Sequence, residues 1–148
     1  MRRRRGFSDG IIGPVVVLGA IYVAQPGIAK PFLPAKQYEG VVARVVDGDT
    51  FYLSGVKRRI RLWGLDAPER HHFMGPAATA ELRRLVNGRR LVCKQIDTDK
   101  YGRIVGQCFR SDGSDVTALM IKSGKAREYT YFSGGYYAAR SIFARDGK

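Results

Sequence analysis

Three short clusters of polar residues have the composition of a site that handles a phosphate and a cation. They are Asp47-Gly48-Asp49-Thr50, then Arg61 followed by Asp66-Ala67-Pro68-Glu69, and then Asp99-Lys100-Tyr101-Gly102-Arg103. Carboxylate and carbonyl oxygens are the ligands that calcium prefers. Arginine side chains stabilise the extra charge on a five-coordinate phosphorus, and a further carboxylate can take a proton from water. Taken together, the clusters predict phosphodiester chemistry.

Each cluster alone has a simpler interpretation. Asp-Gly-Asp is a common hairpin turn, and an arginine at a strand edge is usually a solvated charge. The segment 66–69 can cap the start of an oncoming helix, where acidic groups are favoured. Each cluster nevertheless comes where a predicted strand meets a turn. In a barrel such junctions collect at one rim, so the carboxylates are expected to converge on one cation.

The elements that must position these clusters follow from hydrophobic periodicity and turn residues. The domain is expected to start near Tyr38, and period-two alternation from Lys57 to Trp63 indicates a half-buried strand. Five strands are predicted, over residues 38–46, 50–54, 57–63, 90–96 and 103–109.

Three helices are expected around these strands. The first begins at Pro76 and stops at Asn87-Gly88, the second ends at Gly124, and the third covers residues 135–145. Five short strands with a helix inserted after the third indicate an α+β, mainly β fold. The expected architecture is a five-stranded Greek-key barrel of the oligonucleotide-binding (OB) type with about three helices.

The chain is strongly basic, with a formal net charge of +13. Removing the first thirty residues still leaves 21 basic against 12 acidic groups, so the excess charge belongs to the domain itself. Such a surface attracts polyanions, which means nucleic acid or anionic lipid. Charge alone does not separate an enzyme from an architectural nucleic-acid-binding protein.

The N-terminal segment is typical of exported proteins. Four arginines at positions 2–5 precede an apolar run over 11–24, which is shorter than the roughly 20 residues that span a bilayer. Residues 1–24 are therefore predicted to be a signal peptide or a short membrane anchor. Residues 25–37 are predicted to be a Pro-rich linker, and residues 38–148 the functional domain. The expected location is secreted or periplasmic, or attached to the inner membrane through the N-terminus.

The two cysteines, Cys93 and Cys108, fall in the two predicted strands on either side of a turn-rich segment. Paired strands would let them face each other, and an oxidising compartment favours a disulfide. The alternative is two small buried thiols. Zinc is set aside because neither cysteine belongs to a CxxC pair and His71-His72 is distant.

The order V-x-D-G-D-T, R-x-R-L-x-G-x-D-A-P-E and D-x-Y-G-R resembles the staphylococcal nuclease (thermonuclease-like) family, over about Tyr38 to Tyr137. The resemblance implies a monomeric, calcium-dependent endonuclease that cleaves DNA and RNA with little sequence demand. It implies Asp49, Asp66 and the backbone carbonyl of Ala67 as calcium ligands. Ala67 stands where the best-known member carries threonine, which keeps the carbonyl but not the hydroxyl.

The resemblance also implies roles for the remaining polar residues. Glu69 becomes the general base, and Arg61 and Arg103 stabilise the phosphorane. Lys100 and Tyr101 fall where the family contacts a terminal phosphate, and Tyr129 and Tyr131 fall in the region where it stacks a base. An offset of one residue leaves open which tyrosine stacks. Two further residues, Asp47 and Thr50, are expected beside the metal ligands, whereas His71 and His72 are interpreted as solvated loop residues.

Two other interpretations of the chain are kept. One is an OB-type module at the cell envelope that binds nucleic acid without cleaving it, which is expected to lose Glu69, Arg61 or an aspartate. None of these is lost here. The other is an anchored basic protein that binds the membrane surface electrostatically. That interpretation leaves the ordered carboxylates without a role.

Overall fold

The structure, a computed structural model, describes residues 35–145 and the side chains of residues 35–140. The predicted leader over residues 1–24 lies outside the described residues, as does all but the end of the predicted linker. Within the described part of the chain, no helix has the length and apolar character needed to cross a membrane.

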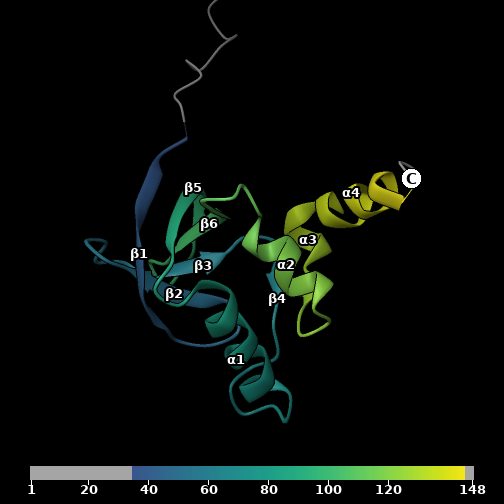
Figure 1. Cartoon of the computed structure of the whole chain (residues 1–148), viewed down its shortest axis with the longest axis horizontal. Helices are drawn as coiled ribbons and strands as arrows, with labels where there is room; N and C mark the ends of the chain where they lie inside the picture. The colour runs from purple at the N-terminus through teal and green to yellow at the C-terminus, as the bar shows by residue number, and fades with distance from the viewer. Residues whose placement is uncertain (1–34, 146–148) are drawn as a thin grey trace, which may run out of the picture. The chain divides into compact units, whose positions relative to one another are not determined.

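A closed five-stranded barrel forms the centre of the described domain (Figure 1), with the strand order β1-β2-β3-β6-β5. Its strands are β1 (Gln37–Val45), β2 (Thr50–Leu53), β3 (Ile60–Leu62), β5 (Arg90–Thr98) and β6 (Ile104–Arg110). All neighbours pair antiparallel except β3 and β6, which run parallel. An irregularity in the pairing between Val42 and Arg44 separates the part of β1 that pairs with β5 from the part that pairs with β2. The predicted OB-type barrel is confirmed.

The described part of the chain forms four helices beside the barrel, where about three were expected. They are α1 (Gly75–Val86), α2 (Val116–Lys122), α3 (Thr130–Ser133) and α4 (Tyr136–Arg145). In Figure 1, α1 lies below the barrel, and α2, α3 and α4 lie to its right. The helix α1 buries Ala78, Leu82, Leu85 and Val86 on one face, as the helical spacing of these residues predicts.

A second sheet was not predicted from the sequence. It consists of β4 (Leu65–Asp66) and β7 (Arg127–Glu128), which pair antiparallel with Leu65 opposite Glu128 and Asp66 opposite Arg127. The third strand is also shorter than the predicted 57–63, because only Thr50–Arg61 and Phe51–Ile60 pair with β2. Arg58 lies outside the strand and donates instead to the Gly102 carbonyl at 2.7 Å and to Thr98 Oγ1 at 3.1 Å.

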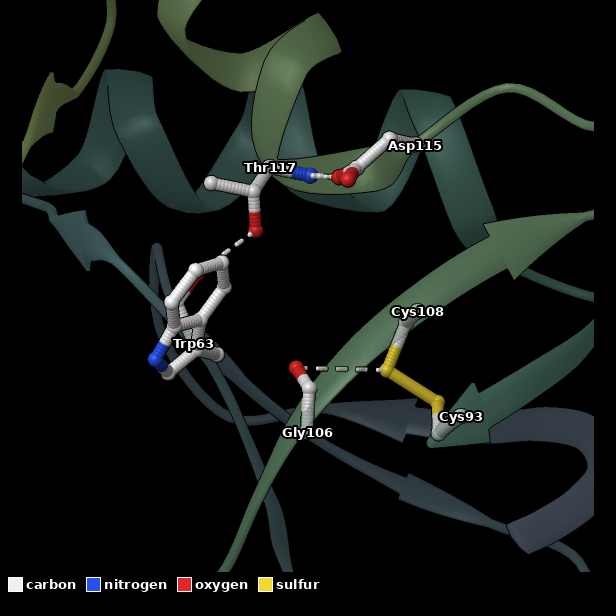
Figure 2. Close-up of a disulfide and its surroundings, with 6 residues drawn as sticks. All are labelled: Trp63, Cys93, Gly106, Cys108, Asp115 and Thr117. Atoms are coloured by element: carbon white, nitrogen blue, oxygen red, sulfur yellow. Dashed lines mark hydrogen bonds between the residues drawn. A yellow bond between two sulfur atoms is a disulfide. The ribbon is translucent and has the colours of Figure 1, made fainter. Parts of the chain in front are cut away.

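A disulfide joins β5 to β6 inside the core (Figure 2). Cys93 and Cys108 lie directly opposite each other, both are fully buried, and their sulfurs are bonded. Nearby, Asp115 caps α2 by accepting from the Thr117 backbone N–H at 2.9 Å, and Thr117 Oγ1 donates to the Trp63 carbonyl at 3.1 Å. These contacts fix α2 against the strand end that leads to the second polar cluster.

Candidate active site

A cavity of about 770 Å³ is lined by residues from all three sequence clusters. Of the residues singled out from the sequence, it contains Asp47, Asp49, Arg61, Ala67, Glu69, Lys100, Tyr101, Arg103 and Tyr129. Asp66, Thr50 and Tyr131 are not part of its lining. The barrel therefore brings together most of the predicted site, although the clusters lie far apart along the chain.

The parallel pairing of β3 with β6 places the two arginines on one face of the sheet. Arg61 lies opposite Val105, and Arg103 precedes Val105 by two residues. Because side chains alternate between faces along a strand, Arg103, Val105 and Arg61 point to the same side. One two-residue step is roughly 7 Å, so the two guanidinium groups reach into the same cavity.

Asp49 is nearly buried, with 10% of its side chain exposed, and it forms an ion pair with Arg61 through Oδ2 and Nη1. Burial raises the pKa of Asp49 to about 6, although the charge of Arg61 and the Thr50 hydrogen bond act to lower it. The neighbouring charge of Asp47 adds to the rise. The attraction of Arg61 is therefore not enough to outweigh the effect of burial on this carboxyl group.

Thr50 connects the two arginines although it does not line the cavity. Its fully buried hydroxyl donates to Asp49 Oδ1 at 2.6 Å and accepts from Arg103 Nη1 at 3.5 Å. In the pairing of β2 with β3, Thr50 lies directly opposite Arg61. Thr50 therefore lies beside Asp49, one of the predicted metal ligands, and also contacts Arg103.

Asp99 holds Arg103, a contact that the sequence does not predict. Its Oδ2 accepts from Arg103 Nε at 2.5 Å, and its Oδ1 accepts from the backbone N–H groups of Tyr101 and Arg103, both at 2.9 Å. Burial acts to raise the pKa of Asp99, but these bonds from Arg103 and Tyr101 outweigh it and lower the pKa. The signal was present in the D-x-Y-G-R motif, where Asp99 begins the turn.

Glu69 lines the cavity on an exposed loop that leads into α1. The loop is closed by two backbone bonds, from His72 N–H to the Glu69 carbonyl and from Gly75 N–H to the His72 carbonyl, both at 2.8 Å. A Cβ on Gly75 would lie 2.1 Å from the Glu69 carbonyl oxygen, so only glycine fits. Among the described residues, no hydrogen bond or ion pair holds the Glu69 carboxylate.

The close approach of Gly48 fixes the Asp47–Asp49 turn against the second cluster. A Cβ at this position would lie 2.9 Å from the Cβ atoms of both Ala67 and Ala78. A side chain here would push the turn away from Ala67 and from helix α1. The first and second clusters are therefore in direct van der Waals contact.

Asp66 does not line the large cavity with Asp49 and Ala67. Its Oδ2 accepts from Arg127 Nη2 at 3.1 Å across the β4–β7 pair, and 46% of its side chain is exposed. Together with Ala67, Pro68 and Glu69 it lines a second, adjacent cavity of about 490 Å³. The sequence does not predict this contact because β7 lies sixty residues further along the chain.

The charge of the large cavity suits a cation. Five carboxylates line it (Asp47, Asp49, Glu69, Asp97 and Asp99), against three basic side chains (Arg61, Lys100 and Arg103). The described residues contain no group of three or more His, Cys, Asp or Glu side chains placed to hold a metal ion. The predicted calcium ligands include only two such side chains, Asp49 and Asp66, together with the Ala67 carbonyl. All three donors are oxygens, which suits a hard cation that keeps most of its water ligands.

Tyr101 and Lys100 also line the large cavity. The Tyr101 ring is 66% exposed, with Lys100 Nζ at 5.1 Å and the Arg103 guanidinium carbon at 5.4 Å from its centroid. Both distances are within the range of cation–π contacts. The predicted substrate-binding pair therefore contacts one of the two arginines.

Three exposed aromatic rings pack together as an aromatic cluster beside the cavity: Tyr129, Tyr131 and Phe132. Tyr129 lines the cavity and packs edge-to-face against Phe132, with ring centroids 4.9 Å apart. Tyr131 is 83% exposed and touches both rings from outside the cavity. Phe132 lines the cavity as well, although no sequence motif singled it out.

The family model described as "Staphylococcal nuclease homologue" matches residues 59–143. These residues carry β3, Glu69, Arg103 and the aromatic cluster, so the match covers most of the cavity lining.

Curated proteins similar to this chain include several with nuclease names. An "uncharacterized endonuclease" of Escherichia coli is 36% identical over 96 residues, which are 64% of this chain and 63% of that protein. A "probable staphylococcal-like nuclease" of Oryza sativa subsp. japonica is 42% identical over 76 residues, which are 51% of this chain and 23% of that protein. A "succinoglycan biosynthesis protein" of Rhizobium meliloti is 34% identical over 114 residues, or 70% and 59% of the two chains. The chain thus spans less than two thirds of each of these relatives.

Proposed function

Because this chain belongs to the family of staphylococcal nuclease homologues, we propose that it hydrolyses the phosphodiester bonds of DNA and RNA as an exported, calcium-dependent endonuclease. The observation that carries the proposal is the shared cavity. Two arginines, the Glu69 carboxylate and a buried carboxylate of raised pKa all face it. These are the groups that hydrolysis of a phosphodiester requires.

Arg61 and Arg103 bind the non-bridging phosphate oxygens. Asp49 contacts Arg61 through Nη1, and Asp99 contacts Arg103 through Nε, so each guanidinium keeps further N–H donors. These donors are fixed in advance by their carboxylate partners. The stabilisation of the developing phosphorane charge therefore needs little reorganisation.

Glu69 accepts the proton of the attacking water. Its carboxylate lines the cavity and no described residue holds it, so it is available to a water molecule. The backbone of the loop that carries it is nevertheless fixed by Gly75 and by the two loop-closing bonds. The water oxygen then attacks phosphorus in line with the leaving oxygen, and the bond between phosphorus and that oxygen breaks while Arg103 donates a hydrogen bond to it.

Asp49, Asp66 and the carbonyl of Ala67 are the residues proposed to hold calcium. When bound, the cation neutralises the negative charge of the phosphodiester beside the cavity's carboxylates. For Asp66 this means giving up its contact with Arg127, whose side chain is 86% exposed and whose ion pair is correspondingly weak. Asp47, which accepts from the Asp49 backbone N–H at 3.1 Å, fixes the turn that carries Asp49.

Lys100, Tyr101, Tyr129 and Tyr131 are proposed to bind the rest of the nucleotide. Lys100 contacts a neighbouring phosphate, whereas exposed aromatic rings stack on bases without regard to sequence. Tyr129 is the stronger candidate for stacking because it lines the cavity, and Tyr131 extends the same surface outward. This combination suits a nuclease of low sequence demand.

Export is proposed from the arginine-rich start and apolar run within residues 1–24, which act as a signal peptide or an inner-membrane anchor. The buried Cys93–Cys108 disulfide supports a secreted or periplasmic location, since such bonds persist in oxidising compartments. Millimolar calcium outside the cell suits a site with few protein ligands. The protein is proposed to act as a monomer.

The competing function is an OB-type module that binds nucleic acid without cleaving it. The full-length protein should be incubated with labelled single-stranded DNA and RNA in calcium, and in excess chelator. Cleavage of both nucleic acids that stops in chelator supports the nuclease. Tight, salt-sensitive binding without cleavage in any divalent cation supports the binding module and overturns the catalytic proposal.

A further inference from the structure

A second groove of about 490 Å³ adjoins the large cavity, and most of its lining has no role in the proposed chemistry. Ala67, Pro68 and Glu69 line both hollows, so the segment with the proposed base forms the wall between them. A ligand bound at Glu69 in the large cavity is therefore next to residues that line the second groove.

The β4–β7 sheet also connects the two hollows. Arg127 of β7 lies in the second groove, and two residues later Tyr129 lines the large cavity. The Tyr129 N–H donates to the Gly64 carbonyl at 2.8 Å, which fixes this run of chain beside β4. The segment from Arg127 to Tyr129 therefore contributes to the lining of both hollows, and it leads into the aromatic cluster.

The second groove offers donors suited to phosphate. Lys125 and Arg127 line it, and the Arg127 guanidinium is largely exposed, with a contact to Asp66 through Nη2. His72 also lines it, and its Nδ1 accepts from the Met74 backbone N–H at 3.2 Å. Because Nδ1 makes this bond, Nε2 is the ring nitrogen that remains to contact a ligand.

The large cavity alone is too small for the substrate of an endonuclease. Its volume is that of a site for a small ligand, which corresponds to one or two nucleotides. OB folds that bind single strands typically contact about 4–16 nucleotides. A strand held at Glu69 must therefore continue past the cavity, and the second groove begins at the same residue.

We propose that the second groove binds the continuing nucleic-acid strand on the far side of the scissile phosphate, with Lys125, Arg127 and the His72 imidazole contacting its backbone. The proposal rests on the nuclease function for its ligand and adds a second binding site to it. Its consequence is that affinity grows with strand length beyond what the large cavity can hold.

The test compares Lys125→Gln with Arg90→Gln in the full-length protein. Both substitutions remove one positive charge. Arg90 is the first residue of β5, whereas Ile96–Lys100, which line the large cavity, lie at and just beyond the last residues of that strand. Binding of a fluorescent single strand of about 12 nucleotides is followed by anisotropy, in chelator, over a range of salt concentrations. Removal of one cation that binds a phosphate should lower the salt slope by about 0.7 and the affinity about fivefold at 0.1 M salt.

Lys125→Gln is expected to lower the affinity about fivefold, and Arg90→Gln by less than half of that factor. The double variant Lys125→Gln with Arg127→Gln is expected to lower the affinity more than Lys125→Gln alone. The affinity of Lys125→Gln for a dinucleotide should differ little from that of the wild type, because a dinucleotide ends before the second groove. Equal losses of affinity in Lys125→Gln and Arg90→Gln, or equal losses for both ligand lengths, would overturn the proposal. Because binding is measured without cleavage, the result stands even if the protein proves not to be a nuclease.

Discussion

The guanidinium of Arg61 holds the carboxylate of Asp49, so the residue assigned to the phosphate is the direct partner of a residue assigned to the cation. The pair is part of a longer chain of contacts that runs through Thr50 and Arg103 to Asp99. A substitution at one end of this chain is therefore expected to change the groups at the other end.

Asp49→Asn should abolish the response to calcium. Asparagine keeps an oxygen that can accept from the Thr50 hydroxyl, but it loses the charge that pairs with Arg61 and that is proposed to bind the cation. Calcium should therefore raise the melting temperature of the wild type but not of the variant, when each is compared with the same protein in chelator. A variant that calcium still stabilises as much as the wild type would contradict the assignment.

Asp99→Asn tests whether Asp99 positions Arg103. Asparagine keeps the oxygen that accepts from the Tyr101 and Arg103 backbone N–H groups, but it loses the charge that holds the Arg103 side chain. We expect kcat to fall about tenfold or more, with a smaller change in KM. In a double-mutant cycle with Arg103→Lys the two reductions in kcat should not add, because both substitutions remove the same interaction. Additive reductions would mean that Asp99 acts independently of Arg103.

Gly75→Ala should disable the enzyme without unfolding it. The new Cβ would clash with the Glu69 carbonyl oxygen and displace the loop that carries the proposed base. A displacement of about 1 Å at a catalytic group lowers the rate by about 100-fold. Gly106→Ala is the matched control, since its nearest contact would be at 3.5 Å, an ordinary van der Waals distance. If both variants keep wild-type kcat, the position of the loop does not control catalysis.

Glu128→Gln tests how the start of α4 is held. The Glu128 carboxylate accepts from Ser133 Oγ at 2.6 Å and from the backbone N–H groups of Tyr137 and Ala138, both at 2.8 Å. Burial acts to raise the pKa of Glu128, but these bonds outweigh it and lower the pKa below 4.5. The stabilisation is thus present above the ordinary pKa and is lost as the pH falls through the folded-state pKa.

At about pH 7 the variant should therefore be less stable by about 1–2 kcal/mol, and the difference should shrink as the pH is lowered below 4.5. Thermal unfolding followed by circular dichroism at several pH values measures this difference. Glu39→Gln serves as the control, because Glu39 forms an exposed ion pair with Arg90 and should change stability little. A pH-independent loss of stability in Glu128→Gln would contradict the account.

The sequence predicts the barrel and most of the cavity because their signals are local. Alternating residues mark the strands, and Pro76 with Asn87-Gly88 places α1 within one residue of its observed start. Ordered motifs likewise identify Asp49, Arg61, Glu69 and Arg103, which do line one cavity.

Features that depend on long-range contacts are not predicted. The strands β4 and β7 are two residues each, too short for any periodicity to show, and only their pairing defines them. The turn of Asp66 toward Arg127 follows from that pairing, as does the second groove. The position of Tyr129 inside the cavity and of Tyr131 outside it likewise depends on how α3 begins.

The central claim is that Glu69 activates water for phosphodiester hydrolysis, and kcat for a single-stranded oligonucleotide in calcium tests it most directly. The full-length wild type is compared with Glu69→Gln and with the control Glu39→Gln, while anisotropy checks that the variants bind the strand equally. The account predicts that Glu69→Gln lowers kcat by about 100- to 10,000-fold and that Glu39→Gln does not. Cleavage by Glu69→Gln within about threefold of the wild type would show that the base lies elsewhere and contradict the account.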